Sequence, residues 1–138
     1  MEEMTMREIQ LTNLYKTMGI DMELLPDGKV KVEQVTDTNG ILLNQYDLRQ
    51  RGKQVFPNRH IVPKVFFLDT DVVTPLWIQS KMSEVGIYQR DLSRQIGMDE
   101  TVVSKLINGK RPMTRAVQAL FYYYFTLYEV TRDTRQEE

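Results

Sequence analysis

Residues 87–110 constrain the fold more than any other part of this chain, because two short helical patterns meet there at a glycine. Leu92 and Ile96 precede Gly97 at helical spacing, and an apolar pair that ends at Ile107 follows it. Gly97 can end the first helix, because glycine adopts the left-handed conformation at little cost. The pattern predicts two helices that cross steeply over a three- or four-residue turn, as in a helix-turn-helix.

Residues around this turn fit the same arrangement. Asp99 can cap the second helix by accepting backbone N–H bonds at its start. Ser93 is small at the point where the two helices would touch, so their backbones can approach closely. Asn108 and Gly109 supply turn chemistry where the second helix should end.

Residues 97–112 read G-M-D-E-T-V-V-S-K-L-I-N-G-K-R-P. This stretch resembles the phage-repressor-like, Cro/C1-type (XRE) DNA-binding family, which carries Gly-Val-Ser-Gln-x-x-Val/Ile-Ser-x-x, a hydrophobic pair, Asn-Gly and basic residues. Gln89 opens the helix that ends before Gly97, as in many members. The resemblance covers about residues 75–128, under half of the chain. It implies a sequence-specific transcriptional regulator, most often a repressor, that reads double-stranded DNA in the major groove with the helix near residues 99–108.

The resemblance also implies roles for single residues. It assigns base reading to Glu100, Thr101 and Lys105, and it assigns phosphate contacts to Gln89, Asn108, Lys110 and Arg111. Threonine can donate, accept or touch a thymine methyl, and lysine can donate to guanine O6 and N7. Glu100 departs from the family, because many relatives carry glutamine there. A carboxylate only accepts hydrogen bonds, so Glu100 should favour the cytosine amine.

The charge of the chain is unevenly distributed, although the net value is only −1. Residues 77–115 hold seven basic and four acidic side chains, and residues 48–65 hold five basic ones and no acid. Within the second segment, the stretch 49–63 shows no helical or strand period and contains Gly52, Pro57 and Pro63. It is predicted to be a loop, which is either simply solvated or a DNA-contacting arm. The arm residues would be Arg49, Arg51, Lys53 and Arg59.

The remaining N-terminal sequence predicts a small α+β extension. Residues 4–18 have the spacing of an amphipathic helix, and alternating residues around the turn at Pro26-Asp27-Gly28 indicate a β-hairpin. Residues 41–43 could add a third strand, and residues 65–68 form a short apolar run of strand or plug character. The predicted fold is mainly α with a small β element. Residues 1–74 form the extension, residues 75–131 the phage-repressor-like helical domain, and residues 132–138 a frayed tail.

The last long helix, to about residue 130, is rich in aromatic residues, and rings fall outside a single apolar stripe. One explanation is that all of them are core. The other is that a partner subunit or the N-terminal segment covers one side. Members of the family often dimerise through this helix, which implies a homodimer on an inverted repeat. The interface residues would be Phe121, Tyr122, Tyr124, Phe125 and Tyr128.

Catalytic and metal-binding functions find little support. The chain has no cysteine, one histidine, no Gly-rich phosphate loop and no Gly-x-Ser-x-Gly motif, so neither an enzyme nor a cofactor is expected. No apolar run has the length of a membrane span and the start is acidic, so we expect a cytoplasmic protein. The alternative function is that of an antitoxin, in which the N-terminal half binds a protein partner while the helix-turn-helix binds DNA.

Overall fold

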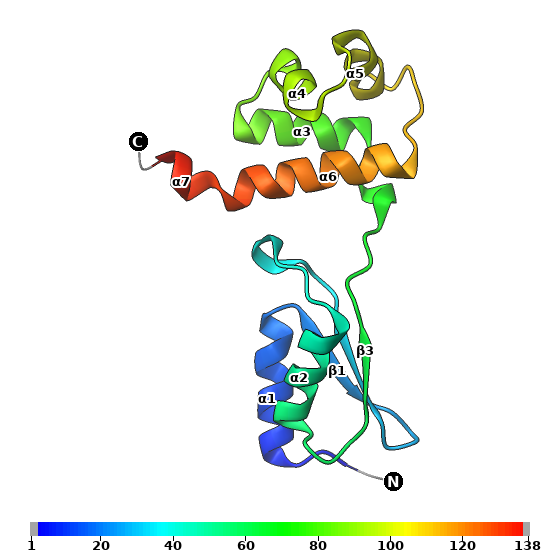
Figure 1. Ribbon diagram of the computed structural model, residues 1–138, viewed down its shortest axis with the longest axis vertical. Helices are drawn as coiled ribbons and strands as arrows, with labels where there is room; N and C mark the ends of the chain where they lie inside the picture. The colour runs from blue at the N-terminus through cyan, green and yellow to red at the C-terminus, as the bar shows by residue number, and fades with distance from the viewer. Residues whose placement is uncertain (1–2, 137–138) are drawn as a thin grey trace. The chain divides into compact units, whose positions relative to one another are not determined.

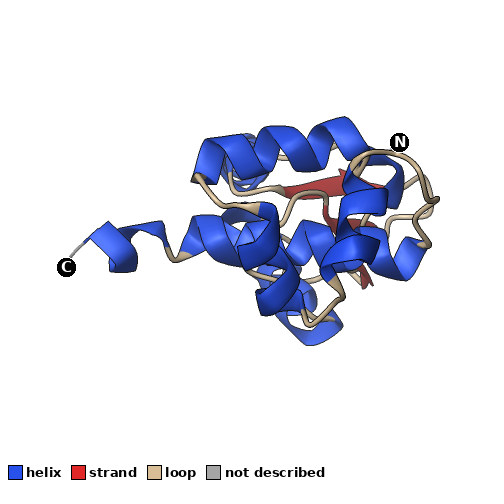
Figure 2. Cartoon of the chain, turned by 90° about the horizontal axis from the view of Figure 1, so that it is seen from above, coloured by secondary structure: helices blue, strands red, loops and turns tan. Residues whose placement is uncertain are grey.

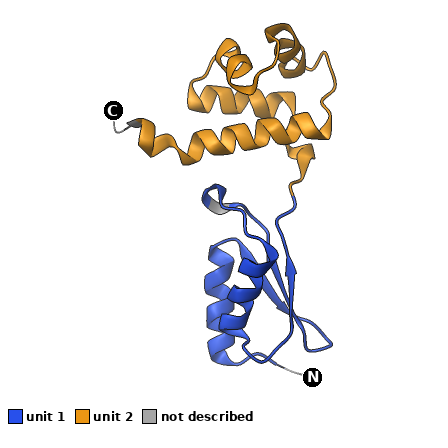
Figure 3. Cartoon of the chain, viewed as in Figure 1, with its two compact units in different colours: residues 1–67 blue, residues 68–138 orange. Residues whose placement is uncertain are grey.

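The computed structural model describes residues 3–136 and is mainly helical with one three-stranded sheet (Figures 1 and 2). This confirms the expected mainly-α fold with a small β element. The chain divides into two compact units, unit 1 of residues 1–67 and unit 2 of residues 68–138 (Figure 3). Unit 1 ends before residue 74, because Val73 is fully buried in the core of unit 2 and its carbonyl accepts a bond from Gln118.

Unit 1 places two helices and a sheet around a core of its own. Its elements in chain order are α1 (Met6–Thr17), β1 (Ile20–Leu24), β2 (Val30–Gln34), the 3-10 helix η1 (Thr38–Gly40), α2 (Gln45–Val55) and β3 (Ile61–Lys64). The strands lie in the order β1-β2-β3, with β1 antiparallel and β3 parallel to β2. The predicted first helix and hairpin are therefore confirmed. The third strand is β3 and not residues 41–43, and the apolar run 65–68 is not a strand.

The prediction of a loop at residues 49–63 is wrong, because helix α2 and strand β3 occupy most of it. Asn44 and Asp47 form a capping box that starts α2, with the Asp47 N–H donating to Asn44 Oδ1 at 2.8 Å. Gly52 lies against the sheet, where a Cβ atom would come within 2.9 Å of side-chain carbons of Ile61 and Val32. Gly52 therefore does not break the helix but lets its backbone approach the strands.

The core of unit 1 forms where alternate strand residues face the helices. It contains Ile20, Met22, Val30, Val32, Leu48, Val55, Phe56 and Ile61. The other face of the sheet is polar, and there the ammonium of Lys31 lies 3.2 Å from Glu23 and 3.7 Å from Glu33. Pro63 lies in β3, which is an edge strand of the sheet. Proline has no N–H to donate, and an edge strand tolerates this at a position where the N–H would point away from the neighbouring strand.

Unit 2 consists of helices. They are η2 (Thr70–Val72), α3 (Pro75–Val85), α4 (Gln89–Ile96), α5 (Glu100–Ile107), α6 (Arg115–Val130) and α7 (Arg132–Gln136). Thr74 caps α3 by accepting from the Trp77 N–H at 3.1 Å. Residues 132–136 form the short helix α7 where a frayed tail was predicted, and residues 137–138 lie outside the described part of the chain.

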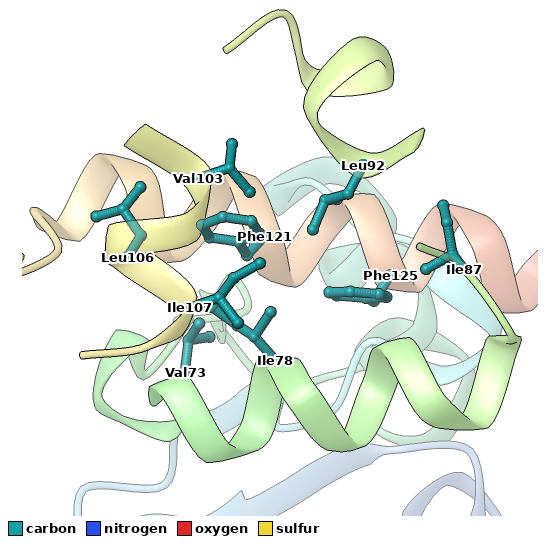
Figure 4. Close-up of a cluster of buried hydrophobic side chains, with 9 residues drawn as sticks. All are labelled: Val73, Ile78, Ile87, Leu92, Val103, Leu106, Ile107, Phe121 and Phe125. Carbon is teal, nitrogen blue, oxygen red and sulfur yellow. The ribbon is translucent and has the colours of Figure 1, made fainter. Parts of the chain in front are cut away.

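A single hydrophobic cluster holds the helices of unit 2 together (Figure 4). It consists of Val73, Ile78, Ile87, Leu92, Val103, Leu106, Ile107, Phe121 and Phe125. Its members come from every helix between α3 and α6, so the orientation of α4 and α5 depends on α6. Within residues 3–136, no helix combines the length and the apolar character that crossing a membrane would require.

Candidate nucleic-acid interface

The turn between α4 and α5 is fixed by hydrogen bonds from both of its ends. Gly97 is left-handed with φ 70°, and the N–H of Met98 donates to the carbonyl of Ser93 at 3.1 Å. The buried Ser93 hydroxyl donates in return to the Met98 carbonyl. Asp99 caps α5, because its carboxylate accepts from the Thr101 N–H at 2.8 Å. The roles predicted for Gly97 and Asp99 are confirmed, and the orientation of α5 is set by these local bonds.

Helix α5 has a buried face and an exposed face. Val103, Leu106 and Ile107 belong to the hydrophobic cluster and are fully or almost fully buried. The side chains on the other face are exposed, and these are Glu100, Thr101, Lys105 and Asn108. All three side chains predicted to read bases therefore lie on one accessible helix face. The helix spacing brings them together, since residues 100, 101, 105 and 108 lie within about half a turn of one another.

The predicted phosphate-contacting residues at the end of α5 are held close to this face. Gly109 has φ 71°, and the N–H groups of Lys110 and Arg111 both donate to the carbonyl of Lys105, at 2.9 Å and 3.2 Å. With the Gly109 N–H bond to the Leu106 carbonyl, this is a Schellman motif. The side chains of Lys110 and Arg111 are exposed. Two cationic side chains are thus attached to a backbone of fixed geometry at the C-terminal end of α5.

Ser104 is a member of the exposed face that the sequence interpretation missed. It lies one turn after Glu100 and one turn before Asn108, and it is half-buried. The Asn108 amide donates to its hydroxyl at 3.3 Å, so Ser104 helps to orient Asn108. The signal that could have identified it is the i, i+4 spacing from both neighbours.

Basic side chains near α5 differ in whether acids neutralise them. Among the residues that the structure describes, Lys105, Lys110 and Arg111 form no ion pair, and neither does Glu100. Lys81 on α3, in contrast, lies 2.8 Å from Glu129 and 3.7 Å from Glu84. The hydrogen bond with Glu129 raises the pKa of Lys81, which fits a structural role. The cations at the end of α5 remain available for an anionic ligand.

Helix α4 contributes less to this surface. Gln89 is the first residue of α4 and is half-buried, while Arg90 and Arg94 are exposed one turn apart. The Arg90 guanidinium lies 5.7 Å from the centre of the Tyr88 ring. The structure therefore puts Gln89 at a helix start, which is the position that the resemblance implies for it.

The basic residues predicted to form a DNA arm are instead built into unit 1. Arg51 donates to the Asp47 carbonyl at 3.2 Å, Lys53 to the Arg59 carbonyl at 2.7 Å, and Arg59 to the Gly28 carbonyl at 2.9 Å. Arg49 is exposed on α2. A loop-like arm is therefore wrong, because α2 and the turn before β3 are folded structure and three of the four cations donate to backbone carbonyls. Contact of these cations with DNA stays a prediction.

The residues of α6 that were predicted to form a dimer interface make contacts within unit 2. Phe121 and Phe125 are fully buried in the core of unit 2, so they are not interface residues. Tyr122 stacks on Trp77 with ring centres 6.1 Å apart, and the Tyr124 hydroxyl donates to Gln95 of α4. The Arg135 guanidinium carbon lies 3.7 Å from the centre of the Tyr128 ring. These five side chains stabilise unit 2 itself. The interface prediction is wrong for Phe121 and Phe125, and it stays a prediction for the half-buried Tyr122, Tyr124 and Tyr128.

The position of Tyr124 leads to a prediction about pH. Burial, followed by the nearby charges of Tyr128 and Asp91, raises the pKa of Tyr124 to about 12. Because the folded-state pKa lies above the usual tyrosine value of about 10, the stabilisation is complete below pH 10 and is lost as pH rises towards 12. In an absorbance titration at 295 nm, Tyr124→Phe should lose the phenolate that forms at the highest pH. A variant whose titration equals that of the parent would contradict this assignment.

No site for a metal emerges from residues 3–136, where no three or more His, Asp or Glu side chains gather in a way that could hold an ion. Comparisons of this chain with protein-family models, with curated proteins and with solved structures gave no match.

Proposed function

We propose that unit 2 binds double-stranded DNA with α5 in the major groove, and that the protein is a sequence-specific transcriptional regulator of the phage-repressor-like type. The observation that carries the proposal is the exposed face of α5. It presents Thr101 and Lys105 beside Asn108, and the cations Lys110 and Arg111 follow it directly. An α-helix fits the major groove, where donors and acceptors of each base pair can be read.

The chemistry of this face divides into two parts. Side chains at the start of α5 are suited to base edges, since Thr101 offers a hydroxyl and a methyl and Lys105 an ammonium. Side chains at its end are suited to phosphate oxygens, since Asn108 is a neutral donor and Lys110 and Arg111 are cations. The Schellman motif fixes the distance between the two parts, so that base reading and backbone contact would occur in one register.

The test is the salt dependence of DNA binding. We expect the parent chain to retain specific fragments of genomic DNA, and Lys110→Ala with Arg111→Ala to lower the slope of log K against log salt by about two. The matched control is Arg7→Ala with Lys16→Ala, which removes the same charges from exposed positions of α1. Equal slopes for both double variants, or no retention of DNA at low salt, would overturn the proposal.

A second prediction concerns base preference. The exposed carboxylate of Glu100 forms no ion pair within the described residues, so it can accept from a cytosine amine. Glu100→Gln should move the preference at one position from C·G towards A·T, with a change of about 1–3 kcal/mol. Selection of binding sites from a random pool measures this directly. The same preferred sequence for both proteins would remove Glu100 from the base-reading residues.

The antitoxin hypothesis is retained as a second candidate because unit 1 has a hydrophobic core of its own and exposes Ile41 and Leu42. A unit with such a core can serve as a separate protein-binding module. Purification from the native host distinguishes the two candidates. A stoichiometric small partner that stays bound would favour the antitoxin, and a chain that purifies alone and shifts DNA would favour a regulator without such a partner.

A further inference from the structure

Strand β1 is an edge of the sheet in unit 1, and half of its residues direct their backbone groups away from β2. The ladder between β1 and β2 includes a 2.9 Å bond from the Val35 N–H to the Gly19 carbonyl and a 2.8 Å bond from the Leu25 N–H to the Lys29 carbonyl. Hydrogen-bonded pairs alternate in an antiparallel ladder, so the odd-numbered residues of β1 bond to β2. The even-numbered residues point their N–H and C=O groups outwards, where no strand of the described residues pairs with them.

A groove of about 860 Å³ lies beside this outer edge. It is lined by Met22 and Leu24 from β1 and by Met4 and Ile9 from around the start of helix α1. The Ile9 side chain is 38% exposed although it belongs to this lining. Outward backbone groups next to an apolar groove are what an extended peptide uses when it adds a strand to a sheet.

The opposite edge of the sheet, strand β3, is blocked for such an addition. The Val30 N–H donates to the His60 carbonyl at 3.0 Å, so the even-numbered residues of β3 direct their backbone groups at β2. Pro63 is therefore at an outward position, where it offers no N–H to a further strand. Proline at such a position is one of the ways in which proteins keep an edge strand from pairing. Strand β1 contains no proline, so the outer side of β1 is the edge that can accept a strand.

The charges beside the groove indicate which kind of peptide fits. Glu3 lines the groove, and the exposed Glu23 lies between Met22 and Leu24 in β1. Residues directly opposite one another on paired strands have their side chains on the same face. Peptide residues opposite Met22 and Leu24 would therefore enter the apolar groove, and the residue between them would lie beside the Glu23 carboxylate. Lysine or arginine suits that middle position, and a carboxylate there would be repelled.

We propose that an extended segment of a partner protein, with apolar and basic residues in alternation, adds to β1 as a fourth strand of the sheet. Its apolar side chains fill the groove between β1 and α1, and its backbone bonds to the outward groups of Met22 and Leu24. The added strand runs antiparallel to β1, which is the more stable pairing per residue. The site rests on neither candidate function, because peptide binding is measured without DNA and without a toxin.

The first test is an NMR titration of the full chain with the synthetic peptide Val-Lys-Val-Lys-Val-Lys. The amide signals of Met22 and Leu24 should shift, and those of α5 should not. Ile9→Asn should raise the dissociation constant about tenfold, because it removes apolar area from the groove without changing the charge. Leu14→Asn is the matched control, since Leu14 is 57% exposed on the same helix and does not line the groove. Circular dichroism checks that both variants fold. Equal constants for the two variants, or no shift in β1 with millimolar peptide, would overturn the proposal.

The second test identifies the backbone hydrogen bonds. In an antiparallel strand, the valines of the peptide direct their N–H groups at β1 and the lysines direct theirs away. The peptide with N-methylated valines should therefore bind at least about tenfold more weakly than the peptide with N-methylated lysines. The reverse order would support strand addition in the parallel direction. Equal affinities of the two methylated peptides would overturn strand addition, because the groove would then bind side chains alone.

The third test concerns the basic residues of the peptide. The parent chain should bind the lysine peptide at least about threefold more tightly than Val-Glu-Val-Glu-Val-Glu, and Glu23→Lys should remove this preference. Glu84→Lys is the matched control in unit 2, because both carboxylates are more than half exposed and both lie near a lysine ammonium, at 3.2 Å for Glu23 and 3.7 Å for Glu84. An unchanged preference in Glu23→Lys would overturn the assignment of a basic segment. No DNA is present in these experiments, so their failure would leave the proposed DNA binding unaffected.

Discussion

Phe121→Ala is expected to lower the free energy of unfolding of unit 2 by about 3–5 kcal/mol, which is the range for truncating a fully buried phenylalanine. Phe121 has no exposed surface, and it lies among Val103, Leu106 and Ile107 (Figure 4). Its removal leaves a cavity directly behind α5, and the surrounding residues can fill it only in part. The variant should therefore also lose the DNA binding that we propose for unit 2, because α5 is no longer held in place.

Urea denaturation monitored by hydrogen exchange at single amides measures this effect in each unit separately. The control is Leu76→Ala, because Leu76 is largely exposed on α3 and its truncation should cost less than about 0.5 kcal/mol. Amides of α2 and β2 should keep their protection in Phe121→Ala, since the cores of the two units share no residue. A loss of protection of equal size in both units would show that they unfold together.

Gly52→Leu is expected to destabilise unit 1 by about 3 kcal/mol, at the upper end of the range for overfilling a packed core. The first added carbon would already lie 2.9 Å from methyl groups of Ile61 and Val32, and both of these residues are fully buried and have little room to move. Leucine is the better helix former by somewhat under 1 kcal/mol, which offsets only a part of the cost. A unit of this size has little stability in reserve.

Gln50→Leu provides the matched control for Gly52→Leu. It inserts the same side chain into the same helix at an exposed position, so the free energy of unfolding should change by less than about 0.5 kcal/mol. Hydrogen exchange should show that Gly52→Leu loses protection in β2 and β3 while amides of α5 and α6 are unchanged. If Gly52→Leu were as stable as the parent, α2 would not be in close contact with the sheet.

The sequence predicted best where neighbouring residues determine the structure. Gly97 ends α4 and Asp99 starts α5, and in both cases the hydrogen bonds join residues at most five positions apart. The accessible face of α5 follows from the same local information. Once its apolar residues are known to face inward, helix geometry places Glu100, Thr101 and Lys105 on the opposite side. Base reading by this face is a prediction that the DNA experiments will test.

The tertiary structure decided what depends on residues far apart in the chain. Around Gly52 the sequence suggests a loop, and a helix forms there because Gly52 fits against Ile61 and Val32 and because Leu48 and Val55 reach the same core. Helix α6 contains rings on every side, and only its packing against α3, α4 and α5 determines that Phe121 and Phe125 face inward and Leu127 outward. Caps and turns are encoded by bonds between near neighbours. Which face of a helix is buried depends instead on the surface that the rest of the chain offers it, and no local pattern specifies that surface.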